Sequence, residues 1–162
     1  MKTQTPKLQV HLIADTSAPS HYVLAALHDF GDRRAHVWPN VTQGRFHVHD
    51  IENASADVTE ELWPTGIWER CRYEWSDAGW ITATVVESNA LQSGSSYSMT
   101  LSPIDAGTRV EVQVLRDFLR GPRGRFVEGV NRLAGRWLLA WDLRRALSAI
   151  EEDWATAGPA DH

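Results

Sequence analysis

The sequence is poor in cysteine and has no long apolar run. Its one cysteine, Cys71, excludes an internal disulfide and any zinc site built on several cysteines. No window approaches the roughly 20 apolar residues that a membrane span needs. The first ten residues also lack the apolar stretch of a signal peptide. We therefore expect a cytoplasmic protein without a membrane span.

Positive charge is scarce as well. The net charge of −5 at pH 7 argues against a general nucleic-acid binder. Arginine is nevertheless concentrated between Arg116 and Arg145, where eight arginines face three acids. We interpret these arginines as a solvated helix face rather than an anion-binding patch.

The chain is long enough for one domain with one core, and we place that domain at residues 1–155, followed by a flexible tail at 156–162. Tryptophan is abundant, with eight residues. So many large aromatic side chains indicate either a bulky core or the walls of an apolar ligand site.

Hydrophobic periodicity predicts an order of elements. Residues 7–14 alternate between apolar and polar, which predicts a strand. Capping residues at Asp15–Ser17 and Pro19 then predict the start of a helix that ends at Gly31. The segment "RRAHVW" predicts one shorter helical turn before Pro39. From Gly44 to Leu119 the period is two. Six strand candidates follow there: "RFHVHDIE", "DVTEEL", "IWERCRYEWS", "WITATVVES", "SSYSMTLSPI" and "TRVEVQVLRDFL". Their short connections predict an antiparallel meander.

A long helix is predicted after "RGPRG". Its apolar face is expected to comprise Phe126, Val127, Val130, Leu133, Ala134, Trp137, Leu138 and Trp141. Beyond Trp141 the apolar positions Leu143, Leu147 and Ile150 move to another side of the helix. If the chain's own strands leave those three uncovered, they would form a partner or homodimer surface.

A seven-stranded antiparallel sheet must cover its apolar face, and only the last helix is long enough to do so. The fold class is therefore α+β, with a curved sheet, two short helices and one long C-terminal helix around an internal cavity. A ligand would bind in the gap between the sheet and the helix.

This arrangement resembles the helix-grip (SRPBCC) superfamily, which includes START lipid-transfer domains, the birch-pollen allergen type and bacterial polyketide cyclase/dehydrase-like proteins. Agreement with the last branch lies in "VWPN", "GIWERCRYEWSD", "ITATVVESN", "GTRVEVQV" and "GRWLLAWDLRRALSAIE", and extends from Leu8 to Glu152. The resemblance implies the fold. Its members range from cofactor-free cyclases and dehydratases to carriers of lipids and protein-binding regulators, so fold alone does not assign an activity.

The candidate catalytic residues are Glu69, Tyr73 and Arg116, which fall on the inward-facing rows of their strands. A buried carboxylate is costly unless it is paired. Glu69 could therefore form an ion pair with Arg116 or reach water, or it could be a general acid/base whose pKa is raised by apolar surroundings. If Glu69 is a general acid/base, Tyr73 and Arg116 would stabilise a developing oxyanion.

The expected ligand-binding wall is aromatic and aliphatic. It comprises Trp38, Cys71, Trp75, Tyr97, Met99, Val112, Val114, Leu133, Trp137 and Trp141. Cys71 is interpreted as a small buried filler rather than a nucleophile. No metal or cofactor is expected, because His47 and His49 share the outward row of their strand and no third ligand is evident.

Three functions remain open from the sequence. The protein could bind an apolar, polyketide-like or aromatic molecule and catalyse its cyclisation or dehydration. It could instead carry a lipid or hydrophobic metabolite without turnover, or act as a protein-interaction module. An unpaired, reachable Glu69 favours the enzyme, whereas a Glu69–Arg116 pair favours the carrier.

Overall fold

The expected order of elements is confirmed. The computed structural model describes residues 8–38, 41–62 and 65–158. In chain order the elements are β1 (Leu8–Thr16), α1 (Ser20–Leu27), α2 (Arg34–Val37), β2 (Val41–Ile51), β3 (Ser55–Leu62), β4 (Ile67–Ser76), β5 (Trp80–Ser88), β6 (Ser96–Ile104), β7 (Gly107–Arg116) and α3 (Pro122–Ala157). The two helices after β1 are short, as the breaks at Gly31 and Pro39 predict.

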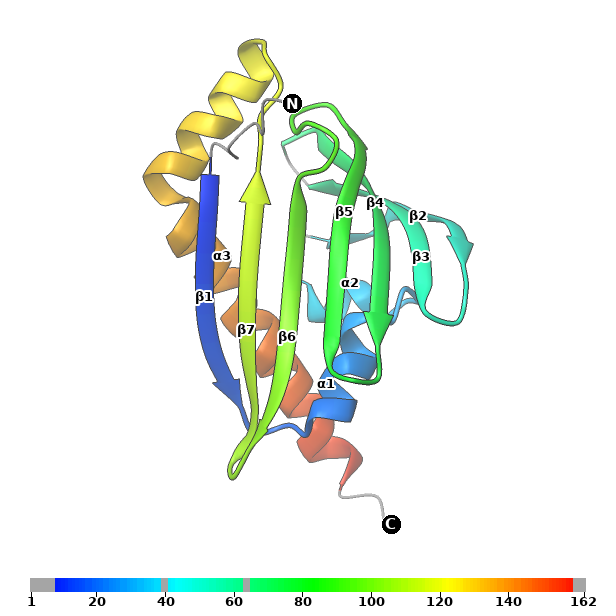
Figure 1. Ribbon diagram of the computed structural model, residues 1–162. Helices are drawn as coiled ribbons and strands as arrows, with labels where there is room; N and C mark the ends of the chain where they lie inside the picture. The colour runs from blue at the N-terminus through cyan, green and yellow to red at the C-terminus, as the bar shows by residue number, and fades with distance from the viewer. Residues whose placement is uncertain (1–7, 39–40, 63–64, 159–162) are drawn as a thin grey trace.

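The strands form one curved antiparallel sheet in the order β1-β7-β6-β5-β4-β3-β2 (Figure 1). Six strands follow one another as a meander, and β1 closes the sheet beside β7. Side chains alternate between faces along each strand, so that Val110, Val112 and Val114 of β7 are fully buried while the residues between them are exposed. α3 and the two short helices lie on the buried face (Figure 1).

The second half of α3 supplies much of the core. Leu143, Ala146, Leu147 and Ile150 are buried, so the condition under which Leu143, Leu147 and Ile150 would form a partner surface is not met. The chain covers them itself. The helix also continues through Ala157, so residues 156 and 157 of the expected flexible tail are helical, and residues 159–162 lie outside the described part.

The first half of α3 differs from the sequence prediction. Phe126, Leu133 and Trp137 are 70%, 91% and 65% exposed, although they belong to the stripe that was expected to face the sheet. Figure 1 shows the reason: α3 begins at the outer edge of the sheet, beside β1, and passes diagonally behind it. Its first turns therefore contact the molecule on one side only, and the buried face rotates along the helix.

None of the helices in the described residues is long and apolar enough to cross a membrane.

Candidate functional site

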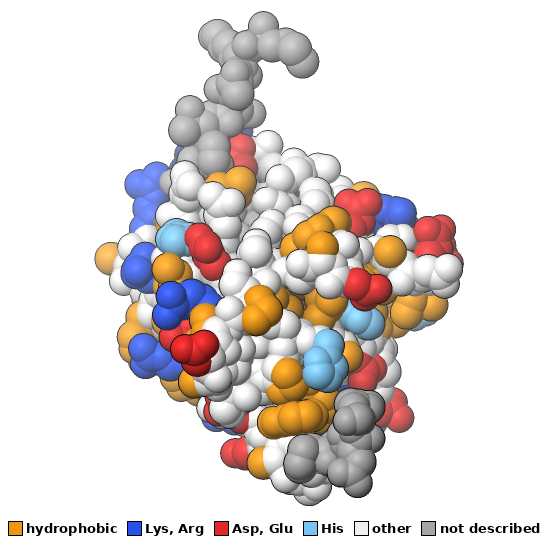
Figure 2. All heavy atoms as spheres, turned by 60° about the horizontal axis from the view of Figure 1, so that its bottom comes forward, with side chains coloured by type: hydrophobic (Ala, Val, Ile, Leu, Met, Phe, Trp, Pro, Cys, Tyr) orange, Lys and Arg blue, Asp and Glu red, His pale blue; other side chains and the backbone are white. Residues whose placement is uncertain are grey.

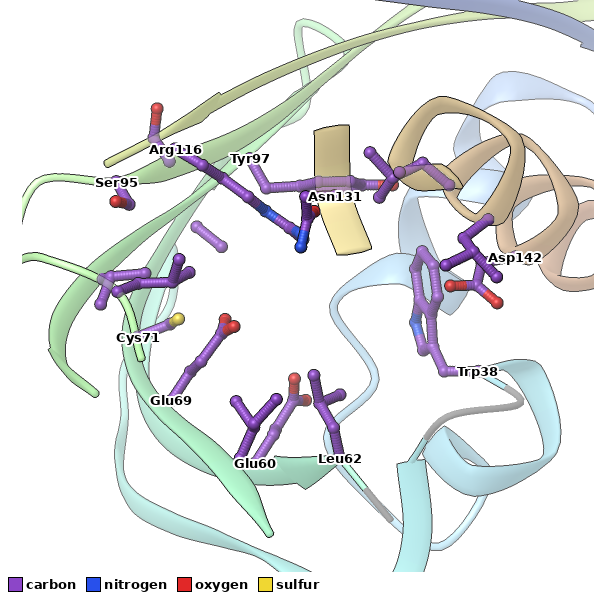
Figure 3. Close-up of a pocket in the computed structure, with 18 of the residues that line it drawn as sticks. Trp38, Glu60, Leu62, Glu69, Cys71, Ser95, Tyr97, Arg116, Asn131 and Asp142 are labelled. Atoms are coloured by element: carbon purple, nitrogen blue, oxygen red, sulfur yellow. The ribbon is translucent and has the colours of Figure 1, made fainter. Parts of the chain in front are cut away.

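A cavity of about 420 Å³ lies between the concave face of the sheet and α3 (Figure 3). Its walls are mostly apolar, with Leu27, Leu62, Ile67, Ile81, Val85, Leu91, Met99, Val127 and Leu139 among them. The volume falls within the range of small-molecule sites in proteins. The charged side chains and the tyrosines in this lining come from α2, β3, β4, β6, β7 and α3.

Glu69 is the polar group that the sequence singled out, and it lies in the cavity wall. It is on the inward row of β4, and in Figure 3 its carboxyl group points into the cavity. Within the described part of the chain, this carboxyl makes no hydrogen bond and no close ion pair. Burial raises the pKa of Glu69; Arg116 acts in the opposite direction, and the neighbouring Glu60 adds to the rise.

Arg116 does not pair with Glu69 but with α3. Its Nη1 donates a hydrogen bond of 2.5 Å to Oδ1 of Asn131. Asn131 in turn donates from Nδ2 to the carbonyl of Val127, at 2.8 Å, which fixes the orientation of the amide. The guanidinium is thus held beside the cavity, near enough to Glu69 to lower its pKa yet not in contact with it.

Tyr73 lines the cavity, but its hydroxyl group already has two partners. It donates to Oε2 of Glu60 at 3.1 Å and accepts from Nη2 of Arg34 at 3.0 Å. Burial raises the pKa of Tyr73 well above its usual value. Because its proton is directed at Glu60, Tyr73 is poorly suited to donate to a ligand oxygen.

Arg34 of α2 is the centre of this second cluster. Its side chain is buried and binds three groups: Oε1 of Glu60 at 2.7 Å, the carbonyl of Leu27 at 3.0 Å and the hydroxyl of Tyr73. Its guanidinium also lies 4.6 Å from the ring centroid of Phe30. Arg34 therefore ties α1, α2, β3 and β4 together at the rim of the cavity.

Tyr97 of β6 has the free hydroxyl group that Tyr73 lacks. It lines the cavity and makes no hydrogen bond to any residue between 8 and 158 that the structure describes. Burial raises its pKa, so the hydroxyl remains protonated and can donate to a ligand. Sequence reasoning had placed Tyr97 in the wall without a chemical role.

Half of the expected ligand-binding residues border the cavity: Trp38, Cys71, Tyr97, Met99 and Trp141. The others do not. Val112 and Val114 are packed in the core, and Trp75 stacks on His28 at 4.7 Å, outside the cavity. Leu133 and Trp137 point away from it into solvent, because α3 begins at the edge of the sheet.

The remaining candidates carry no chemistry in this structure. Burial raises the pKa of the Cys71 thiol far above its usual value, which disfavours the thiolate that a nucleophile requires. His47 and His49 are exposed, as expected, with ring centroids 4.6 Å apart. Within the described residues, His, Cys, Asp and Glu side chains do not gather in groups of three that could hold a metal ion.

Sequence reasoning missed Arg34, Glu60 and Asn131. Glu60 could have been found, since it shares the inward row of β3 with Ala56 and Val58. Register then places it directly opposite Glu69. Arg34 and Asn131 gave no such signal, because burial of a polar residue on a helix depends on what packs against it.

We predict that Glu60→Gln lowers the pKa of Glu69. The two residues are cross-strand neighbours, so a neutral side chain at position 60 removes a repulsion and leaves Arg116 to attract the Glu69 carboxylate. Carboxyl ¹³C NMR titration measures this directly. Glu61→Gln is the matched control, since Glu61 pairs with Arg45 at 2.7 Å and is not part of the cavity. An unchanged or higher pKa in Glu60→Gln would contradict the prediction.

Comparison of the sequence with protein-family models and with curated proteins finds no match. Solved structures do match. The protein TTHA0849 from Thermus thermophilus is 17% identical, with a TM-score of 0.70, over 94% of this chain and 100% of that one. The aromatase/cyclase ZhuI from Streptomyces sp. R1128 is 16% identical, with a TM-score of 0.70, over 94% and 99%.

A START superfamily protein from Mycobacterium smegmatis is 13% identical, with a TM-score of 0.65, over 93% of this chain and 99% of its own. At such identities the likeness concerns the fold. It agrees with the order of strands and helices and with the resemblance found in the sequence. The chain thus has an SRPBCC-like helix-grip fold.

Proposed function

We propose that the protein binds an apolar, aromatic or polyketide-like molecule in its cavity and catalyses proton transfer on it without a cofactor. One observation carries the proposal: Glu69 presents an unpaired carboxyl group to an apolar cavity, next to a guanidinium that Asn131 holds in place. A carboxyl group whose pKa is raised is a stronger base when ionised and a ready acid when protonated.

The chemistry that fits is enolisation followed by ring closure. The Glu69 carboxylate takes a proton from a carbon next to a ketone, and the C–H electrons form an enolate whose oxygen accepts hydrogen bonds from Arg116 or Tyr97. The enolate carbon then attacks a second carbonyl carbon of the same molecule. The alkoxide so formed takes back the proton from Glu69, which leaves a cyclic alcohol and the carboxylate restored.

Dehydration uses the same groups. Glu69 removes a second proton next to the new alcohol, hydroxide departs as water with a proton from the carboxylic acid, and a carbon–carbon double bond remains. The names of two similar structures, an aromatase/cyclase and a START superfamily protein, are in keeping with an apolar ligand.

A carrier without turnover is the second candidate, and the mainly apolar walls favour it. Two features support the enzyme instead. Glu69 is not locked against Arg116, and Tyr97 is an unengaged donor. The size of the cavity argues against a pure protein-interaction module, for which a collapsed interior would be expected.

Native mass spectrometry of freshly purified protein, with extraction of any bound molecule, tests occupancy of the cavity. We expect an apolar small-molecule adduct that Ala83→Phe displaces, because Ala83 lines the cavity. Val86→Phe is the matched control on the same strand, since Val86 is exposed and outside the cavity. If no apolar compound binds the wild type, or if both variants bind it equally, the proposed site is wrong.

A further inference from the structure

The first half of α3 carries an exposed apolar seam whose residues are spaced like those of a helix-packing interface. The seam consists of Phe126, Val130, Leu133 and Trp137, separated by four, three and four residues. This is the alternation that places side chains on one narrow line along a helix and that coiled coils use to pack against a partner helix. None of the four is buried, and Leu133 at the centre is 91% exposed.

From this seam we propose that the protein forms a symmetric homodimer in which the α3 helices of two copies pack antiparallel through Phe126, Val130, Leu133 and Trp137. The proposal is independent of the proposed function.

The seam is self-complementary. Two aromatic side chains form its ends and two aliphatic ones its middle, so reversing the helix reproduces the same pattern of sizes. In an antiparallel pair Phe126 of one copy meets Trp137 of the other, and Val130 meets Leu133. A two-fold axis requires this kind of match, since each copy contributes the same surface. Gly129 lies beside the seam and allows close approach of the helices.

The apolar area is adequate for such an interface. At roughly 150–250 Å² for a whole aromatic side chain, the exposed parts of Phe126 and Trp137 present on the order of 200 to 300 Å². Val130 and the 91% exposed Leu133 add to this. A homodimer interface of about 800 Å² per partner contains roughly 500 Å² of apolar surface.

Charge permits self-association although α3 is rich in arginine. The four seam positions carry no charge. Arg132 forms an ion pair with Glu128 at 2.9 Å, and Arg136 donates to the carbonyl of His11 at 3.0 Å. Both are thus held by their own chain. Figure 2 shows basic, acidic and apolar side chains interspersed over one face of the molecule. A helix that lies on a bilayer typically presents a broader apolar face than this single line.

Dimerisation would also complete the helical wall of the cavity. Phe126 and Val130 line the cavity and are also 70% and 37% exposed. In the antiparallel arrangement Trp137 and Leu133 of the second copy cover their exposed parts. Each copy therefore shields part of its partner's cavity wall from solvent.

Sedimentation velocity at about 1 to 100 µM tests the dimer. We expect the wild type to be dimeric at the upper concentrations. Leu133→Gln should weaken association by at least about tenfold, and Leu133→Gln with Trp137→Gln by about a hundredfold or more. The Tm of both variants should equal the Tm of the wild type measured at dilutions where the wild type is monomeric. Trp80→Gln, at an exposed tryptophan on the outer face of the sheet, is the matched control and should stay dimeric.

Disulfide cross-linking tests the antiparallel register. Two forms, Val130→Cys and Leu133→Cys, each with Cys71→Ala, carry tags of different size and are mixed under mild oxidation. We expect the mixed dimer to cross-link faster than either protein with itself, because residues 130 and 133 face each other. Faster cross-linking of Leu133→Cys with itself would indicate parallel helices and overturn the proposal. Three other results would also overturn the proposal. The wild type could remain monomeric, the seam variants could leave the dimer intact, or a monomer could use the seam to bind vesicles of phosphatidylglycerol.

Discussion

Replacement of Glu69 by Gln is expected to lower kcat for the cyclisation or dehydration by about 10²- to 10⁴-fold. Gln keeps the size of the side chain and can still hydrogen-bond, but it cannot accept the proton. Ligand affinity should change little, because the cavity walls supply most of the contact. Parallel measurement of single-turnover rates and of ligand binding separates the two effects. Glu61→Gln, outside the cavity, should leave both unchanged.

The same variant has a predicted effect on stability that does not depend on knowing the substrate. The pKa of Glu69 is raised in the folded protein, so the folded state holds the proton more tightly than the unfolded chain does. Between the ordinary and the raised pKa, the free energy of unfolding therefore falls as pH rises. Gln avoids this loss, and Glu69→Gln should have a higher Tm than the wild type at neutral pH and the same Tm at low pH. Equal activity and an unchanged Tm would contradict both predictions.

Arg34→Met is expected to destabilise the fold by about 3 to 5 kcal/mol, because it leaves the Glu60 carboxylate without its partner beneath the protein surface. The carbonyl of Leu27 and the hydroxyl of Tyr73 each lose a hydrogen bond as well. Urea unfolding at neutral pH measures the loss. Adding Glu60→Gln to Arg34→Met should restore part of the stability, since the uncompensated charge is then removed.

The neighbouring arginine provides the control. Arg33 pairs with Asp153 at 2.7 Å on the surface, where an ion pair contributes about 1 kcal/mol or less. Arg33→Met should therefore have a small effect. If Arg34→Met were no more destabilising than Arg33→Met, the buried cluster would not hold α2 to the sheet as we describe.

The fold was predictable because its signals are local and periodic. Alternation along the strands identified the inward row of Glu69, Cys71 and Tyr73, and short turns predicted the antiparallel meander. The resemblance to the helix-grip superfamily agreed with the same elements.

The contents of the cavity were less predictable, since they depend on where elements pack. Periodicity identified an apolar stripe on α3 but could not show that the helix begins at the edge of the sheet, which turns Leu133 and Trp137 outward. Periodicity also could not identify the hydrogen-bond partners of Arg116 and Tyr73. Asn131 and Arg34 reach them across the fold, from helices that periodicity alone does not position.

The most direct test of the account is the pKa of Glu69 itself, measured by carboxyl ¹³C NMR titration of the wild-type protein. An unpaired carboxyl group in an apolar cavity predicts a pKa clearly above the ordinary value for Glu, about 4.3. A ligand that occupies the cavity should alter it further. A pKa at or below the ordinary value would mean that Glu69 is ion-paired with Arg116, and would contradict its role as a base.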